Sequence, residues 1–227
     1  MVIAGMVVAI EINAVIEKYG KPIRTEKRAG VVVMEYKTGY GTLYVAHSGA
    51  GEIAAAAATA LLIGHFGAEV IINFGVVGGL TPEMALTSTV VVSGVVHYDF
   101  DAHEIGWGEQ GKYPEFDNVI IPTTPMLVEK AQKILPDLQA VVCASADKFV
   151  GDSEAKAALN RSFNALICDM ETAGVVITAA RAEIPCLIIK SVSDSVNGGP
   201  EEFEKMLESA SAVCIDIADK ILGETFK

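Results

Sequence analysis

The stretch AEVIINFG, residues 68–75, decides the fold class of this 227-residue chain. After Glu69 it is almost entirely apolar, and a short run of this kind is typical of a strand buried on both faces of a sheet. The preceding residues 51–67, GEIAAAAATALLIGHFG, are rich in alanine and leucine, which favours a helix that Gly67 can end. A buried strand directly after a helix indicates an α/β protein.

Strands and helices alternate along the rest of the chain in both directions. We expect strands over residues 1–10, 87–99, 139–147, 164–170 and 184–194, and a hairpin of 30–38 and 41–49 joined by Gly39 and Tyr40. We expect helices over 124–135, 171–183 and 200–222, and one more between residues 147 and 164. The sequence therefore predicts a single α/β domain over residues 1–227, with a mixed central β-sheet flanked by helices on both faces.

The composition narrows the classes of function. A formal net charge of −12 argues against a nucleic-acid partner, because a phosphate backbone needs a basic surface. The apolar runs are too short to cross a membrane, and the N-terminus lacks the basic segment and cleavage site of a secretory signal. Four cysteines, widely spaced in apolar surroundings, fit neither a zinc site nor a disulfide framework. We expect a cytoplasmic protein without a metal, a cofactor or a membrane partner.

Polar residues follow several of the expected strands, where ligands gather in open α/β sheets. NFGVVGGL, residues 73–80, overlaps the end of the 68–75 stretch; its glycines either let the backbone approach a ligand closely or form a turn, and taken alone the motif favours the turn. In CDMETAG, residues 168–174, Asp169 and Glu171 lie where a strand passes into a helix. One carboxylate can cap that helix, while a second in a cleft can hold a sugar diol. Asp194 ends the apolar strand CLIIKSVSD, either as a turn residue or as an acid over a substrate.

These segments are more specific together than apart. In order they are AIEINAV (9–15), HSGAGEIAAA (47–56), IINFGVVGGL (71–80), SADKFV (145–150), CDMETAGV (168–175) and SVSDS (191–195). The set resembles the nucleoside phosphorylase and nucleosidase superfamily, and most closely the 5′-methylthioadenosine/S-adenosylhomocysteine nucleosidases. The resemblance implies a purine nucleoside phosphorylase-like fold and hydrolysis of the N-glycosidic bond of an adenine nucleoside, as in methionine salvage.

The resemblance also implies roles for individual residues. Asp194 would protonate N7 of the departing adenine, with Ser193 orienting it, because an acid at the purine stabilises the leaving group. Glu171 would hold the ribose hydroxyls, where a carboxylate also stabilises the developing positive charge. The other implied substrate contacts are Met170 packing on the sugar, Phe149 stacking on the base, the Val150 backbone at its edge, and Ile10, Ala50, Val76, Val77 and Gly78 lining the site.

Two residues depart from the family pattern at the place where water should be activated. Asn13 occupies the position of the family's glutamate, and an amide is not a useful base. Lys190 occupies the position of an arginine, whose planar fork a lysine does not reproduce. Glu11, two residues before Asn13, would substitute only if the local backbone differs from that of the family. Because Asn13 and Lys190 occupy the positions of the family's water-activating pair, they are the expected catalytic partners of Asp194.

Two alternatives to hydrolysis stay open. A phosphate-dependent purine nucleoside phosphorylase would need basic residues near its phosphate, and the first 17 residues of this chain contain none. A nucleoside-binding relative with weakened catalysis would retain the base and ribose contacts. The sequence favours hydrolysis.

The resemblance also implies a homodimer, because a neighbouring subunit closes the pocket in the family. The loop around Ile105 to Pro114 would lie at the interface and offer the apolar side chains of Ile105, Trp107, Tyr113 and Pro114.

Overall fold

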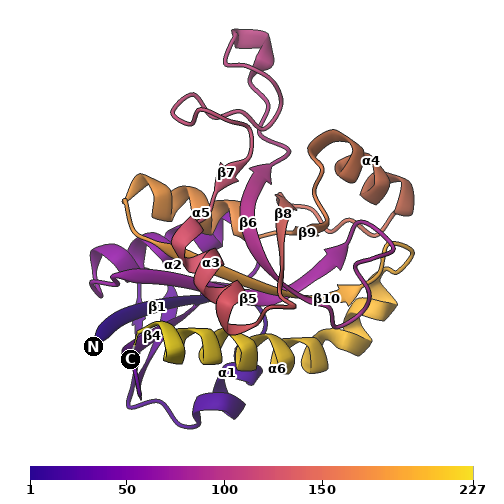
Figure 1. The fold of residues 1–227 in the computed structure, drawn as a ribbon. Coiled ribbons are helices and arrows are strands. Elements are labelled where there is room, and N and C mark those ends of the chain that lie inside the picture. Colours follow the sequence, from indigo (N-terminus) through magenta and orange to yellow (C-terminus); the bar gives the residue numbers. More distant parts are fainter. Residues whose placement is uncertain (227) are drawn as a thin grey trace.

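The structure is a computed structural model, and it describes residues 1–226. Figure 1 shows the order of the elements along the chain. The strands are β1 (Val2–Val8), β2 (Arg24–Arg28), β3 (Val31–Thr38), β4 (Gly41–His47), β5 (Val70–Gly79), β6 (Thr89–His97), β7 (Ile121–Pro122), β8 (Gln139–Ser145), β9 (Ile167–Asp169) and β10 (Cys186–Asp194). The helices are α1 (Ile12–Tyr19), α2 (Glu52–Gly64), the short 3-10 helix η1 (His103–Ile105), α3 (Pro125–Ile134), α4 (Ser153–Phe163), α5 (Thr172–Arg181) and α6 (Pro200–Thr225).

All the described strands join one mixed sheet. Its order is β10-β6-β8-β9-β5-β1-β4-β3-β2, with β7 beside β6. Strand β10 also pairs in parallel with β5, so that β5, β10, β6, β8 and β9 close into a ring. Closure brings the ends of β5, β9 and β10 together, and this junction holds the site described below.

Two apolar cores cover the two faces of the sheet. Side chains on β5 alternate between them: Ile72 and Phe74 join the core under α1, α3 and α6, whereas Ile71 and Val77 join the core under α2 and α5. Alternation across a strand places successive side chains on opposite faces, so a strand covered on both sides must be apolar throughout. The predicted α/β domain with helices on both faces is confirmed.

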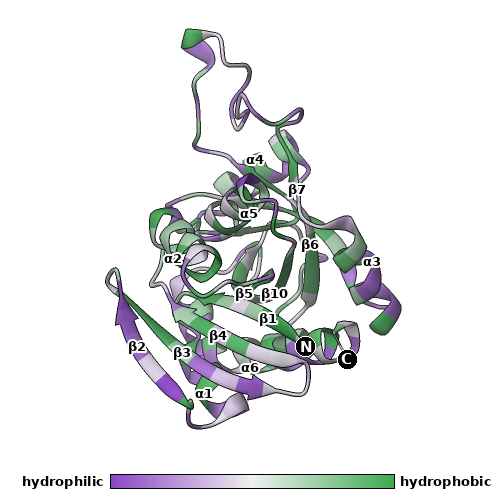
Figure 2. Cartoon of the chain, turned by 90° about the vertical axis from the view of Figure 1, so that its left-hand side faces the viewer, coloured by the Kyte–Doolittle hydropathy of each residue, from purple (hydrophilic) through white to green (hydrophobic). Residues whose placement is uncertain are grey.

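The outer edge of the sheet is more polar. Figure 2 shows β2 as largely hydrophilic, whereas β1, β5 and β10 inside the sheet are mostly hydrophobic. An edge strand with charged residues resists pairing with other chains. No helix within residues 1–226 combines the length and the apolar character needed to cross a bilayer.

Three parts of the sequence-based prediction were wrong. Helix α1 and strand β2 were not expected: α1 is only eight residues long and directly follows β1, although Ile12, Val15, Ile16 and Tyr19 have helical spacing, and β2 is an edge strand with no buried residue. The segment 73–80 is not a turn, because β5 continues through it to Gly79. Pairing with β10 from Val76 to Gly78 and with β9 at Gly78 and Gly79 satisfies the backbone there and extends the strand.

Candidate active site

A cavity opens where β5, β9 and β10 end and where β1 leads into α1. Its walls are formed by Ala9, Ile10, Glu11, Ala50, Val76, Val77, Gly78, Phe149, Cys168, Asp169, Met170, Glu171, Ser193, Asp194 and Phe203. These residues come from seven separate parts of the chain. The fold therefore gathers in one place nearly all of the residues that the sequence singled out.

Sheet register sets the position of Asp194. In the parallel ladder Asp194 lies opposite Gly78, after an irregularity in the pairing between Val192 and Asp194. Such irregularities redirect a side chain at the end of a strand. A Cβ atom on Gly78 would lie 3.0 Å from Asp194 Oδ2, so glycine leaves the space that the carboxyl group occupies. Asp194 is thus held at the wall of the cavity by backbone pairing.

Asp194 has two polar neighbours from the protein. The hydroxyl of Ser193 lies 3.1 Å from Oδ1, and the buried ammonium of Lys156 donates to Oδ2 at 2.6 Å. Ser193 was expected to orient Asp194, and its position is compatible with that role. Lys156 was not singled out by the sequence; its only signal is a lone cation among the alanines of residues 155–158.

The two carboxylates at the start of α5 have different surroundings. The Thr172 backbone N–H donates to Asp169 Oδ1 at 3.2 Å, so Asp169 caps the helix. Glu171 has no capping hydrogen bond; it lines the cavity and accepts the Gly51 backbone N–H at 2.9 Å through Oε1. One carboxylate therefore serves the helix and the other faces the cavity, which is the division expected from the sequence.

Lys190 lies behind the cavity wall. Its ammonium is 2.8 Å from Asp169 Oδ2, and it is absent from the cavity-lining residues. Burial lowers the pKa of Lys190, but the charges of Asp169 and Glu171 outweigh burial and raise it above the ordinary value. Lys190 thus supports the carboxylates from behind, which differs from the expected position beside a reacting water.

Burial and crowding shift two carboxyl groups strongly. Burial, followed by the charge of Asp169, raises the pKa of Glu171 to about 7. The same causes raise the pKa of Glu52 to about 8; Glu52 accepts the Gly174 backbone N–H through Oε2, and its Oε1 lies within hydrogen-bond distance of the Ser145 hydroxyl. Burial also disfavours the charged form of Asp169, but Lys190 and neighbouring hydroxyl groups outweigh it, and its pKa lies below the ordinary value. Asp169 is therefore the ionised member of the group, and titration of Glu171 falls near neutral pH.

Glu11, and not Asn13, reaches the cavity. Glu11 is buried, with Oε1 accepting the Val76 N–H at 2.9 Å and Oε2 accepting the Ile10 N–H at 3.0 Å. Asn13 is exposed and lines an adjoining hollow next to α6, which shares Ile10 and Glu11 with the cavity. The chain turns into helix α1 at Ile12, and residues two apart on a helix point in nearly opposite directions. The helical backbone therefore separates the two side chains, and Asn13 does not occupy the place in the cavity that was expected of it.

Aromatic rings border the opposite end of the cavity. Phe149 is 42% exposed, and its ring meets that of Phe203 from α6 edge-on, with 5.6 Å between the ring centroids. The Val150 side chain points away and packs in a small core with Leu80 and Cys168. Phe203 was not anticipated, because nothing in the sequence of α6 distinguishes a ring that borders the cavity from one that packs in the core.

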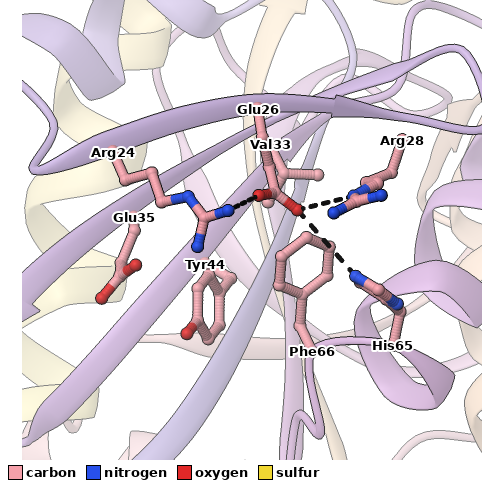
Figure 3. Close-up of a pocket in the computed structure, with 8 residues that line it drawn as sticks. All are labelled: Arg24, Glu26, Arg28, Val33, Glu35, Tyr44, His65 and Phe66. Carbon is pink, nitrogen blue, oxygen red and sulfur yellow. Dashed lines mark hydrogen bonds and ion pairs between the residues drawn. The ribbon is translucent and has the colours of Figure 1, made fainter.

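A second hollow lies over β2, β3 and β4 and the end of α2 (Figure 3). Its charged groups neutralise each other around Glu26, which pairs with Arg24, with Arg28 at 3.0 Å and with His65 at 3.9 Å. The hydrogen bond from Arg28 holds the pKa of Glu26 below its ordinary value. None of the residues predicted to carry chemistry lies here. Among residues 1–226, no three His, Cys, Asp or Glu side chains are grouped in a way that would hold a metal ion.

Comparisons with known proteins agree with this architecture. The model of the phosphorylase superfamily matches residues 1–223. A 5′-methylthioadenosine/S-adenosylhomocysteine nucleosidase of Staphylococcus aureus is 31% identical over 186 residues, which cover 79% of this chain and 81% of that protein. The nucleosidase of the same name from Helicobacter pylori, crystallised with a pyrrolidine ligand, superposes with a TM-score of 0.92 at 25% identity over 98% of both chains. Futalosine hydrolase of Helicobacter pylori shares the fold, with a TM-score of 0.92 at 24% identity over 98% of this chain and 97% of that one.

Proposed function

We propose that this chain, which belongs to the phosphorylase superfamily, hydrolyses the N-glycosidic bond of adenine nucleosides such as 5′-methylthioadenosine and S-adenosylhomocysteine. The observation that carries the proposal is the pairing of Asp194 and Glu171 in one cavity that has an exposed aromatic ring, Phe149, at its edge. A stacking ring, an acid and a second carboxylate are the groups that breaking a purine–ribose bond requires.

The leaving group departs toward Asp194. Breaking the bond leaves an electron pair on the purine, and a proton delivered to N7 neutralises it. Asp194 lines the cavity at the end of β10, with Ser193 beside it, which supports this role for the pair. Glu171, with Met170 next to it, holds the ribose hydroxyls and stabilises the positive charge that develops on the sugar.

Glu11 activates the water. Its carboxylate is oriented by the N–H groups of Val76 and Ile10, so that it enters the cavity with little freedom to turn. A Cβ atom on Gly75 would lie 2.6 Å from Glu11 Oε1, so the backbone of β5 leaves room for this orientation. A fixed carboxylate beside the sugar can take the proton that the attacking water loses. Glu11 thereby supplies the base that Asn13 lacks.

Charge around the cavity favours water over phosphate as the nucleophile. Of the lining residues within the described chain, four are acidic (Glu11, Asp169, Glu171 and Asp194) and none is arginine, lysine or histidine. The two nearby cations, Lys156 and Lys190, are each paired with an aspartate. The net negative charge of the cavity would repel a phosphate dianion, whereas it does not repel a neutral water molecule.

A second copy of this chain is expected to complete the site. The segment between β6 and β7 projects away from the body of the molecule (Figures 1 and 2). It exposes Ile105 and Trp107, whereas Tyr113 turns inward and bonds His97 through its hydroxyl at 2.7 Å. Exposed apolar side chains on a projecting segment support an interface between copies. The homodimer, the cytoplasmic location and a place in methionine salvage stay predictions.

Release of adenine decides between the candidate functions. The purified protein is incubated with 5′-methylthioadenosine or S-adenosylhomocysteine, with and without inorganic phosphate, and free adenine and the sugar product are quantified. We expect equal adenine release in both conditions and a free 5-substituted ribose. Release only with phosphate would instead identify a phosphorylase, and tight binding without release would identify a nucleoside-binding protein.

A further inference from the structure

Lys156 is a completely buried cation next to the proposed acid. It lies on α4, and its side chain is 0% exposed. Its ammonium donates to Asp194 Oδ2 at 2.6 Å, to the Ser195 carbonyl at 2.6 Å and to the Gly198 carbonyl at 3.3 Å. All three donors of the ammonium are therefore used, and one of them joins it to the leaving-group acid.

Stability alone does not account for this pair. A buried ion pair is often no more stable than apolar residues of the same volume, because both charges lose their hydration. The position of the pair, with Asp194 in the cavity wall and Lys156 behind it, points to a role in the reaction.

Two other titratable groups face the pair, and neither changes its charge between about pH 6 and pH 10. Burial raises the pKa of the Cys168 thiol, on β9, to about 12. Hydrogen bonding from the Ser195 backbone lowers the pKa of Glu202, on α6, below its ordinary value. Cys168 therefore stays neutral and Glu202 stays ionised across that range.

We propose that Lys156 holds the proton that the purine receives and passes it through Asp194, so that the leaving-group acid is the Lys156–Asp194 pair and not Asp194 alone. This inference rests on the proposed nucleosidase function. In water, a carboxylic acid retains its proton only to about pH 4, whereas a lysine retains it to about pH 10. A lysine that acts through Asp194 extends proton delivery across neutral and alkaline pH.

The proton transfers balance over the cycle. As the bond between C1′ and N9 breaks, its electron pair stays on the purine, and N7 takes a proton from the Asp194 carboxyl group. Asp194 takes its proton from the Lys156 ammonium, which becomes a neutral amine. Water adds a hydroxyl group to C1′, and its proton passes to Glu11. Once the products have left, that proton returns through solvent in the cavity to Asp194 and from Asp194 to the Lys156 amine.

The decisive comparison uses two leaving groups. One substrate is 5′-methylthioadenosine, whose adenine needs a proton; the other is the 4-nitrophenyl riboside with the same 5′-methylthio group, whose phenolate departs without one. We expect K156M to lower kcat for methylthioadenosine about 10²-fold at pH 8, within the range of general acid catalysis, and to change kcat for the phenyl riboside less than about threefold. The loss for methylthioadenosine should grow with pH, because in K156M the proton must reside on Asp194 itself, and a carboxyl group, even when buried, loses its proton at a lower pH than a lysine.

Two control variants sharpen the result. K156R retains the positive charge and the hydrogen-bond donors but does not release a proton, so it should fail to restore turnover of methylthioadenosine. R161Q removes a cation from the exposed side of the same helix, where Arg161 pairs with Glu154, and should leave both rates unchanged. Full activity of K156R on methylthioadenosine, or equal losses of K156M on both substrates, would overturn the proposal.

The wild-type protein provides a test that does not depend on the folding of a variant. Its kcat for methylthioadenosine should stay level from about pH 6 to pH 9. The contradicting outcome is a kcat for methylthioadenosine that already falls as the pH is raised toward 7, while kcat for the phenyl riboside stays level. That outcome would mean that the proton is held by a carboxyl group and not by a lysine. Wild-type protein that cleaves neither substrate would contradict the proposed function instead, so the two failures are distinguishable.

Discussion

Two buried lysine–aspartate pairs border the same cavity, and they differ in how many acceptor positions of the aspartate are still free for a ligand. Asp169 is 2.8 Å from Lys190 and also accepts hydrogen bonds from Ser145, Thr172 and Cys143. Asp194 is 2.6 Å from Lys156, and its one other partner in the described chain is Ser193 at 3.1 Å. A carboxylate has about four acceptor positions, so Asp169 is saturated while Asp194 retains capacity for a ligand.

The two lysine–aspartate pairs therefore have different roles in the protein. The Lys190–Asp169 pair joins β10 to the start of α5 and holds Glu171 next to the cavity. The Lys156–Asp194 pair joins α4 to the end of β10 and keeps an incompletely satisfied carboxyl group in the cavity wall. We infer that a saturated pair serves stability and an unsaturated pair serves chemistry.

The largest effect is expected from Asp194→Asn. The amide oxygen still accepts from Lys156, but the side chain no longer passes a proton to the purine. We expect kcat for adenine release to fall about 10³- to 10⁴-fold. The amide also leaves the buried Lys156 charge without its counterion, so the free energy of unfolding should fall as well, and kcat is compared on protein shown to be folded. Activity close to that of the wild type would remove Asp194 from the mechanism.

Breaking the saturated pair should damage stability more than chemistry. Lys190→Met leaves the Asp169 charge buried without its cation, and we expect the free energy of unfolding in urea to fall by about 3–5 kcal/mol. The double variant K190M/D169N removes both charges and should recover most of that loss. A single variant as stable as the wild type would show that this pair is not structural.

Glu11 and Asn13 form a matched test of the water-activating side. Glu11→Gln should lower kcat by about 10²-fold or more, because it removes a base and its amide can accept only one of the two backbone N–H groups that orient Glu11. Asn13→Ala is the control and should change kcat less than about twofold, since Asn13 is exposed on α1 outside the cavity. Equal losses in the two variants would contradict the assignment of Glu11.

The smallest expected effect comes from the titration of Glu171. Its pKa is raised to about 7, so its carboxylate becomes protonated as the pH falls through neutrality and holds the ribose hydroxyls less well. We expect kcat/KM for the nucleoside to decrease about tenfold from pH 8 to pH 6, mostly through KM. Glu171→Gln should bind more weakly and show no such pH dependence, and a wild-type kcat/KM that rises toward pH 6 would contradict this role.

Much of the site could be predicted because its residues lie at the ends of strongly apolar strands. Asp194, Glu171 and Phe149 each follow a strand that the hydropathy pattern reveals, and all three line one cavity. Strand pairing brings such ends together whatever the side chains there are. Glu11 was harder to place, because its direction depends on whether the backbone enters a helix at Ile12 or continues as a strand.

Local sequence by itself determined most of the alternation of strands and helices, the two-sided burial of the apolar start of β5, and the order of the polar motifs, since these depend on periodicity within a few residues. Only the tertiary structure decided how the acids are paired. Lys156 meets Asp194 across 38 residues of chain, and Lys190 faces Asp169 and not the cavity. Ion pairs of this kind depend on how the sheet closes and on which side of a helix faces the sheet. A short stretch of sequence predicts neither of these.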